Sequence, residues 1–402
     1  MSTKIFRNIL GLYIICIPLV PFLPRLPIIN INLIRIFGVL LILQSFILKK
    51  NIGNVWKLVF VCNLLIILRI WIDLYFGKNF SDVFTESFSL LCMLSAIIVA
   101  KGSYRYISQL YLLRYLIISS MLGGFFSILL GFDLVLFSFS YKINLTTIAG
   151  FDRTGWVCDS YLAMLGVIGC FSLINISNNK KDFYLCIVGL IFSYITIVFG
   201  MFRSYIVITA AISLIFIYYY LTNMFIKPIS LLVAFLMVLF LCLPNFYIKQ
   251  FENKFDRIAN RIKITSKKDY SYLARKGEME IESQLIKEKP LIGNGFGLAK
   301  LHNVYVFKYG SIPLYGHNLF TGLSARLGIV LTLFIITLML YFGIENLLYY
   351  ISSPNNNNKI LFLAGFIAFI ATIVLGLVIN PILMSYSTPI LAIFIKQKDC
   401  PI

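Results

Sequence analysis

The chain is 402 residues long; 60% of them are hydrophobic, only 13% are charged, and the mean hydropathy is +0.90. Soluble domains carry about 25% charged residues and bury at most about three quarters of their surface, so this composition excludes a soluble globular protein and predicts a polytopic membrane protein. The net charge of +19 comes from 35 Lys and Arg against 16 Asp and Glu. In a membrane protein this excess indicates which loops face the cytoplasm, and it does not indicate nucleic-acid binding.

Twelve apolar stretches are candidates for transmembrane helices, since the hydrocarbon core takes about 20 residues. No twofold alternation of polar and apolar residues occurs, and open sheets cannot sit in lipid, so the expected fold is all-α. The predicted spans lie near residues 8–24, 28–48, 55–76, 84–100, 109–131, 159–176, 183–200, 204–221, 228–247, 318–342, 360–379 and 382–395, of which the last is short.

Basic residues in the short loops predict the orientation. Lys49 and Lys50 follow the second span, and Lys180 and Lys181 follow the sixth, whereas the alternate loops carry only one or two basic residues each. The excess of basic residues marks the cytoplasmic side. Both termini are therefore expected in the cytoplasm.

The sequence divides into three parts: nine spans over 1–247, a long polar loop over 248–316, and three spans with a tail over 317–402. The same orientation places the loop on the outer face. Between Lys249 and Lys308 it has 13 Lys or Arg and 7 Asp or Glu, a net charge of +6. Long loops usually have a function, and a basic outer loop suits an anionic ligand such as a phosphate-bearing lipid. The alternative is a solvated lid.

Within this loop, residues 270–289 predict a helix that Pro290 ends. Gly293, Gly295 and Gly297 then predict a flexible turn. A G-x-G-x-G stretch with no strand before it and no clear helix after it supports neither a dinucleotide-binding fingerprint nor a P-loop.

The only two histidines, His302 and His317, both lie in or next to this loop. His317 directly precedes the tenth span, so it is expected at the membrane surface beneath the loop. There it could act as a general base toward a hydroxyl group, because its ordinary pKa is close to working pH. The alternative is an interfacial histidine bonded to the backbone.

Two arginines are expected at the outer mouths of spans. Arg153 precedes the sixth span and Arg203 begins the eighth. Charges at such depth are costly unless paired or functional, and guanidinium groups bind phosphate oxygens bidentately. Converging arginines would hold a diphosphate; the alternative is that they reach to lipid headgroups. Arg275, in the loop helix, could equally pair with Glu278.

No metal or other cofactor is expected, because no Asp-x-Asp and no His/Cys/Asp/Glu cluster with ligand spacing occurs. The eight cysteines predict small buried side chains. Arg69 and Asp73, one turn apart in the third span, are expected to form an ion pair.

Four motifs lie in the outer loop and at the outer ends of spans. They are Arg153-Thr154-Gly155, Phe202-Arg203, Arg275 with Pro290 fifteen residues later, and His317-Asn318 followed by nine residues and Gly328. In order, sidedness and spacing they resemble the O-antigen ligase and O-antigen polymerase family of lipid-linked polysaccharide glycosyltransferases. The similarity covers roughly residues 150–345.

The resemblance has two departures. The family's ligase motif has a second glycine three positions after the first, where this chain has Leu331, and the family usually has Ser-Arg where this chain has Phe202-Arg203. His302 fails the same motif, because Pro313 stands at the glycine position. His317 is therefore the preferred histidine, and a ligase is slightly favoured over a polymerase.

The resemblance implies a glycosyltransferase C-like fold and metal-independent, inverting transfer at the outer face of the bacterial inner membrane. The donor would be an undecaprenyl-diphosphate-linked glycan. A ligase passes it to a lipid A-core sugar, and a polymerase to another lipid-linked repeat unit. His317 would activate the acceptor or position the diphosphate, which Arg203, Arg275 and Arg153 would bind. The supporting motif residues would be Asn318, Gly328, Gly293 and Gly295.

A twelve-span transporter or lipid flippase is the main alternative from another class. Transporters often have internal repeats and helices broken at mid-membrane. No convincing repeat occurs here, and the polar residues gather on one predicted face. A purely structural membrane anchor would not account for arginines at the mouths of spans.

Overall fold

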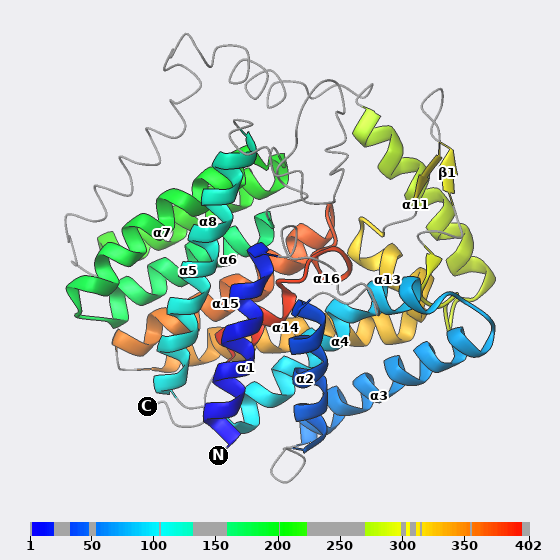
Figure 1. Ribbon diagram of the computed structural model, residues 1–402, viewed down its shortest axis with the longest axis horizontal. Helices are drawn as coiled ribbons and strands as arrows, with labels where there is room; N and C mark the ends of the chain where they lie inside the picture. Colours follow the sequence, from blue (N-terminus) through cyan, green and yellow to red (C-terminus); the bar gives the residue numbers. More distant parts are fainter. Residues whose placement is uncertain are drawn as a thin grey trace.

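A computed structural model shows a helical protein (Figure 1). It describes residues 2–19, 33–47, 54–103, 106–131, 159–200, 202–222, 270–298, 303–305, 311–313, 316–353 and 356–395. In this part of the chain every regular element is a helix except two three-residue strands, β1 (Asn303–Tyr305) and β2 (Ser311–Pro313), which pair antiparallel. The expected helical fold is confirmed.

The first eight predicted spans all have a helical counterpart. They correspond to α1 (Ser2–Cys16) with the 3-10 turn η1 (Ile17–Leu19), α2 (Leu33–Ile47), α3 (Asn54–Tyr75), α4 (Phe80–Ser103), α5 (Tyr106–Gly131), α6 (Ser160–Ile176), α7 (Lys180–Phe199) and α8 (Arg203–Thr222). For α3 to α8 the predicted bounds agree within about four residues. The predicted ninth span, 228–247, lies outside the described residues.

Six described helices are long and apolar enough to cross a membrane: α3, α4, α5, α7, α14 (Ile329–Ser352) and α15 (Asn356–Gly376). By the length and composition of its helices, the chain is a multi-pass membrane protein. Within these apolar segments 83% of the α4 residues are buried but only 28% of the α3 residues, so α4 runs through the centre and α3 along the periphery.

The predicted tenth span, 318–342, is wrong as a single helix. It consists of α13 (Leu319–Leu327) and α14, separated at Gly328, whose φ is +82°. A Cβ atom at Gly328 would lie 2.0 Å from the carbonyl oxygen of Leu291, and the N–H of Ile329 donates to the carbonyl of Pro290 at 2.8 Å. Backbone from the polar loop of residues 248–316 therefore lies against the chain where the sequence predicts an uninterrupted helix.

The predicted last span, 382–395, is not a continuous α-helix either. It forms the four-residue α16 (Pro381–Met384) and the 3-10 helix η7 (Thr388–Phe394), and every η7 residue is buried. Between the two, the hydroxyl groups of Ser385 and Ser387 both donate to Asp159, the N-cap residue of α6. These side-chain bonds hold the chain out of helical geometry.

This irregular segment still passes through the bundle. Near its end, the carbonyls of Ile393 and Phe394 accept from Gln109, close to the start of α5, and from Asn346, close to the end of α14. A 3-10 helix rises about 2 Å per residue, so few residues cover a long distance. Protein covers this non-helical backbone, which is the condition for such backbone inside a membrane.

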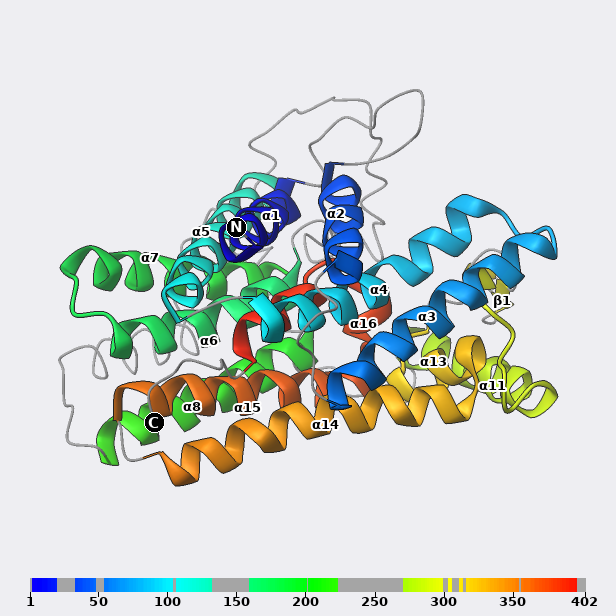
Figure 2. The ribbon, with the colours of Figure 1, turned by 90° about the horizontal axis from the view of Figure 1, so that it is seen from below.

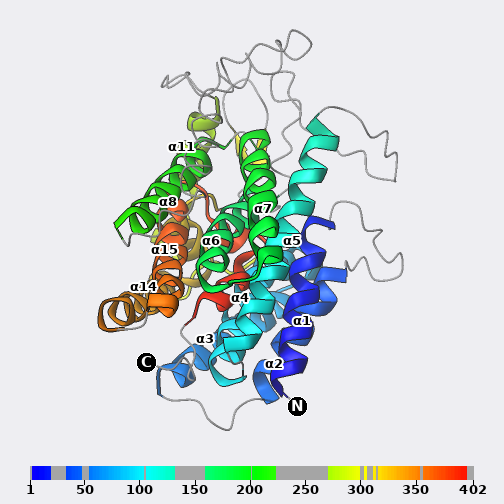
Figure 3. The ribbon, with the colours of Figure 1, turned by 90° about the vertical axis from the view of Figure 1, so that its left-hand side faces the viewer.

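The predicted loop helix is confirmed as α11 (Tyr270–Glu288). With β1 and α13, it lies at the end of the molecule away from the start of α1 (Figures 1 and 3). Figure 2 shows that the end of α3 and the start of α14 both lie toward this end. The turn between α3 and α4, the end of α15 and the start of α13 also meet there, and their side chains form the candidate site.

Candidate functional site

His317 precedes α13 and contacts Glu278 of α11. Its Nδ1 atom is hydrogen bonded to Glu278 Oε2, while the backbone N–H of Gly316 donates to Glu278 Oε1 at 2.6 Å. Glu278 is only 3% exposed. An ionised carboxylate can only accept hydrogen bonds, so contact with one favours the tautomer that has its proton on Nδ1, in which Nε2 is the basic nitrogen of the neutral ring. The histidine thus has a carboxylate partner, not only the backbone partner that the alternative assumed.

Asn318, the next residue of the motif, caps α13. Its side-chain oxygen accepts from the backbone N–H groups of Phe320 at 2.9 Å and Thr321 at 3.1 Å. Its side-chain nitrogen donates to the carbonyl of Leu377, just beyond α15, at 3.0 Å. An amide both accepts and donates, so one side chain starts the helix and fastens it to α15.

A second contact joins α11 to α13 one turn farther along. The hydroxyl group of Thr321 donates to Glu282 Oε2, and Glu282 is 0% exposed. Both side-chain contacts, His317 with Glu278 and Thr321 with Glu282, join residues 39 positions apart in the sequence. The two helices therefore run parallel in a fixed register.

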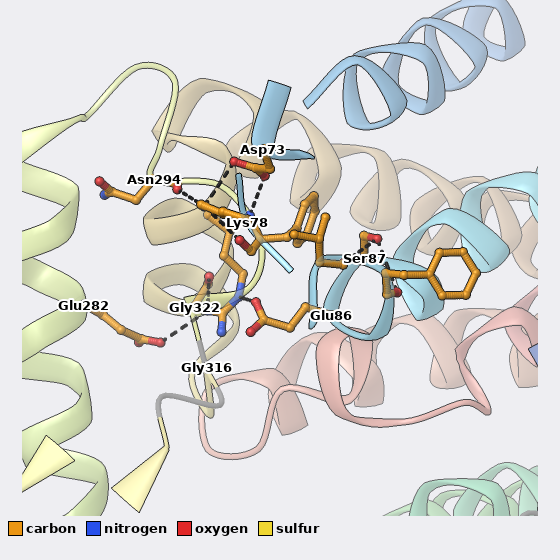
Figure 4. A network of polar contacts seen from close by, with 12 residues as sticks. Asp73, Lys78, Glu86, Ser87, Glu282, Asn294, Gly316 and Gly322 are labelled. Carbon is orange, nitrogen blue, oxygen red and sulfur yellow. Dashed lines mark hydrogen bonds and ion pairs between the residues drawn. The ribbon is translucent and has the colours of Figure 1, made fainter. Parts of the chain in front are cut away.

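Arg326, near the end of α13, is fully buried between two glutamates. Its Nε atom donates to Glu86 Oε2 of α4 at 2.7 Å, and its Nη1 atom donates to the Gly322 carbonyl at 2.9 Å and lies 3.8 Å from Glu282 Oε1. Figure 4 shows Glu86 and Glu282 reaching toward the same point from α4 and α11. A buried charge needs such partners, so Arg326 ties three helices together.

Burial also changes the acidity of Glu282. Desolvation raises its pKa from the ordinary 4.5 to about 7, against the opposing effects of Arg326 and of the Thr321 hydroxyl group. The nearby carboxylates of Glu278 and Glu86 raise it further. Near neutral pH, Glu282 is therefore divided between its protonated and ionised forms.

The glycine-rich turn after α11 lies against α13. The N–H of Asn294 donates to the Ala325 carbonyl at 2.7 Å, and that of Gly295 donates to the Arg326 carbonyl at 2.8 Å. Gly293 and Gly295 both have positive φ, which glycine adopts without strain. The turn was expected to be flexible, but its backbone is held by the end of α13.

The other side of this turn is held by the α3–α4 connection. Lys78 Nζ donates to the carbonyls of Asn294 at 2.6 Å and Phe296 at 2.8 Å, and the N–H of Phe296 donates to Asp73 Oδ2 at 2.8 Å (Figure 4). A Cβ atom at Gly295 would lie 1.9 Å from Asp73 Oδ1. Burial lowers the pKa of Lys78, although Asp73 acts in the opposite direction. The glycines therefore permit backbone packing here.

The predicted ion pair between Arg69 and Asp73 is confirmed, at 3.3 Å, and Lys78 adds a second contact to Asp73 at 3.1 Å. Arg69 is also the one charged residue lining an apolar pocket of about 400 Å³ between α3 and the start of α14. Leu327 and Leu331 line its opposite wall. His317 and Leu327 lie at opposite ends of the nine-residue α13, whose length is about 14 Å.

The structure describes only part of the predicted diphosphate site. Arg275 is half-buried on α11, one turn before Glu278. Arg203 is the first residue of α8, but its side chain lies outside the described residues, as do Arg153 and His302. Convergence of the three arginines remains a prediction, whereas Gly293, Gly295, Asn318 and Gly328 all lie along α13 and the turn that packs on it.

The sequence did not indicate the charged residues Glu86, Glu282 and Arg326, nor Thr321 and Lys78, as parts of the site. The sequence does contain one sign of this cluster, because Arg326 lies inside a predicted span and a charge there requires partners. Glu278 and Glu282 are four residues apart on one predicted helix, which places both carboxylates on the same face. Their partners lie far away in sequence, so spacing alone could not join them.

Comparison of the chain with known protein families and with curated proteins gave no match.

Proposed function

We propose that this chain is an O-antigen ligase of the bacterial inner membrane. It would transfer an undecaprenyl-diphosphate-linked polysaccharide to a lipid A-core sugar, without a metal and with inversion at the anomeric carbon. One observation carries the proposal: His317, at the motif spacing from Gly328, is held by the buried carboxylate of Glu278 at the start of α13. A histidine oriented by a carboxylate is a recurrent arrangement for a general base.

In the proposed reaction, His317 Nε2 removes the proton from the acceptor hydroxyl group. The acceptor oxygen forms a bond to the anomeric carbon as the bond from that carbon to the diphosphate breaks, on the opposite face. The bonding electron pair leaves with undecaprenyl diphosphate. Glu278 keeps Nδ1 protonated and stabilises the imidazolium that forms. A positioned base of this kind accelerates a reaction by about 10²–10⁴-fold.

The leaving diphosphate would be bound by Arg203 and Arg275, with Arg153 nearby. Guanidinium groups placed where negative charge develops lower the barrier without a metal ion. The position of Arg275 on α11, one turn from Glu278, supports this role. The apolar pocket beside α3 offers a surface of the kind that the lipid chain of the donor requires.

The proposed topology has both termini in the cytoplasm and the loop of residues 248–316, with His317, facing the periplasm. Of the expected twelve crossings, the last would be made by α16 and η7, and not by an α-helix. The gathering of the α3–α4 turn, the start of α13 and the end of α15 around α11 supports one common outer face.

The proposal is tested in a strain that lacks this protein and receives variants of it. His317→Ala and Arg275→Ala should each abolish attachment of polysaccharide to the cell surface at normal protein levels. Arg203→Lys should be severely impaired, because an ammonium group cannot bind a diphosphate bidentately. His302→Ala is the matched control and should be near normal. Normal polysaccharide in the His317→Ala strain would exclude the catalytic role.

An O-antigen polymerase is the second candidate, favoured by Leu331 in place of the ligase motif's second glycine. The lipopolysaccharide of the deletion strain separates the two functions. Loss of a ligase leaves bare core while long lipid-linked chains accumulate, whereas loss of a polymerase leaves core with a single repeat unit.

A polysaccharide-lipid flippase is more remote. The buried non-helical segment between α16 and η7 favours it, since transporters use broken helices at membrane depth. An assay of the purified protein in detergent distinguishes the enzymes from a flippase. A ligase or polymerase forms a new glycosidic bond from a lipid-linked donor, and a flippase forms none.

A further inference from the structure

Beyond His317 and Glu278, a second pair of side chains joins α11 to α13 one turn farther along. Glu282 lies one turn after Glu278 on α11, and Thr321 lies one turn after His317 on the α13 side. The two contacts have the same sequence offset of 39 residues. Each contact therefore requires the same alignment of the two helices.

A short helix needs more than one such contact. With nine residues, α13 is too short to be stable in isolation, so its neighbours set its position. Asn318, Arg326 and the glycine-rich turn hold α13 on its other sides, and along α11 the movements that would separate His317 from Glu278 are a rotation of α13 and a slide. A slide of one turn, about 5.4 Å, would move His317 from Glu278 toward Glu282. The contact between Thr321 and Glu282 opposes both movements.

The surroundings of Glu282 fit this positioning role. One carboxylate oxygen accepts from Thr321, and the other has no hydrogen-bond partner among the described residues. The charged groups that face it are Arg326 of α13, Glu86 of α4 and Glu278 of its own helix. A buried glutamate held by one hydroxyl group and one distant guanidinium group lowers the stability of the fold. Such a residue is therefore a candidate for a functional role.

We propose that Thr321 and Glu282 are positioning residues that hold His317 on Glu278, with Arg326 as the buried charge that makes Glu282 tolerable there. The inference rests on the proposed function only for its effect on the reaction rate. Its structural part, the proton position on His317, can be measured whether or not the chain is a ligase.

The chain has only two histidines, so in a His302→Gln background purified without a histidine tag His317 gives the only histidine signals. The nitrogen chemical shifts of labelled histidine distinguish the two neutral tautomers. With Thr321 present, the ring should carry its proton on Nδ1. Thr321→Val, which keeps the side-chain shape without the hydroxyl group, should give a mixture of both tautomers. Thr321→Ser should restore the single tautomer.

In the same background, Thr321→Val should lower kcat with a lipid-linked donor roughly tenfold and leave the KM for the donor unchanged, because a misplaced base slows chemistry and not binding. Should Thr321→Val fail to fold, Glu282→Asp withdraws the carboxylate by one methylene group, keeps its charge and should give the same mixture. Retention of the single Nδ1–H tautomer in these variants overturns the inference. If His317→Ala stays active, the proposed function fails, while the tautomer result still decides the positioning role.

Discussion

Replacing Glu282 with glutamine removes a buried ionisable group while keeping the size of the side chain. Glu282 is fully buried, and its pKa in the folded protein is about 7 in place of the ordinary 4.5. The folded state therefore binds a proton over a pH range in which the unfolded chain has already released it. We expect the stability difference between Glu282→Gln and the wild type to depend strongly on pH.

The sign follows from the raised pKa. The stabilising contribution of wild-type Glu282 is fully present below its unfolded pKa of 4.5 and is lost as the pH rises through about 7. At about 1.4 kcal/mol per pH unit, the shift from 4.5 to about 7 corresponds to about 3 kcal/mol. Relative to the wild type, Glu282→Gln should therefore gain about 3 kcal/mol in free energy of unfolding between about pH 4.5 and about pH 8.

The assay is denaturant unfolding in mixed micelles, followed by the fluorescence of the three tryptophans, at several pH values. Glu280→Gln is the matched control, since it makes the same substitution at an exposed position of the same helix. Comparing each variant with the wild type at the same pH cancels the titration of groups that do not interact with Glu282. A free-energy difference for Glu282→Gln that stays constant across the range would refute the reasoning.

Three further variants test other parts of the site. Gly295→Ala should destabilise the protein by about 1–3 kcal/mol more than Gly77→Ala in the same unfolding assay, because both glycines have positive φ but only Gly295 packs against Asp73. Leu331→Trp should fill the pocket beside α3 and raise the KM for a lipid-linked donor roughly tenfold, whereas Leu331→Gly should not; equal values would dissociate the pocket from donor binding. Asn318→Asp should keep the helix cap but cost about 1 kcal/mol, because it loses the donor to the end of α15.

The membrane helices could be predicted well because each of them depends on local sequence. The segments that became α3 to α8 are long apolar runs between polar loops, and lipid forces the backbone of such runs to satisfy its own hydrogen bonds. The loop helix α11 likewise ends where Pro290 predicts. These elements needed no knowledge of their neighbours.

The two wrong spans depend on contacts between distant segments. Gly328 lies in a continuous apolar stretch, and only the packing of Leu291 against it shows that the helix must break there. In the last segment, the backbone is extended at Ser385, and the hydroxyl groups of Ser385 and Ser387 both bond to Asp159. An apolar run shows that a segment is buried, but it does not show which partner displaces its helical hydrogen bonds.

The residues of the candidate site also divide into those that local sequence predicts and those that depend on distant contacts. The motif around His317 and Asn318 could be recognised from its spacing, and the structure joins the two to α11 and α15. The carboxylate that orients the histidine was considered only as a partner for Arg275, since the sequence does not state which face of α11 meets α13. The buried guanidinium group of Arg326 was hidden inside an apparent span.

The common offset of the two contacts between α11 and α13 also bears on how divergent relatives can be found. Facing residues on packed helices constrain each other's identity, but the connection between the helices can lengthen or shorten without disturbing them. A search pattern of two glutamates four apart, a variable gap, and a histidine and threonine four apart would tolerate insertions between residues 289 and 315. It would also tolerate loss of the glycine that Leu331 replaces here. Correlated substitutions at positions 282 and 321 among such sequences would then indicate that the relatives keep the same alignment of the two helices.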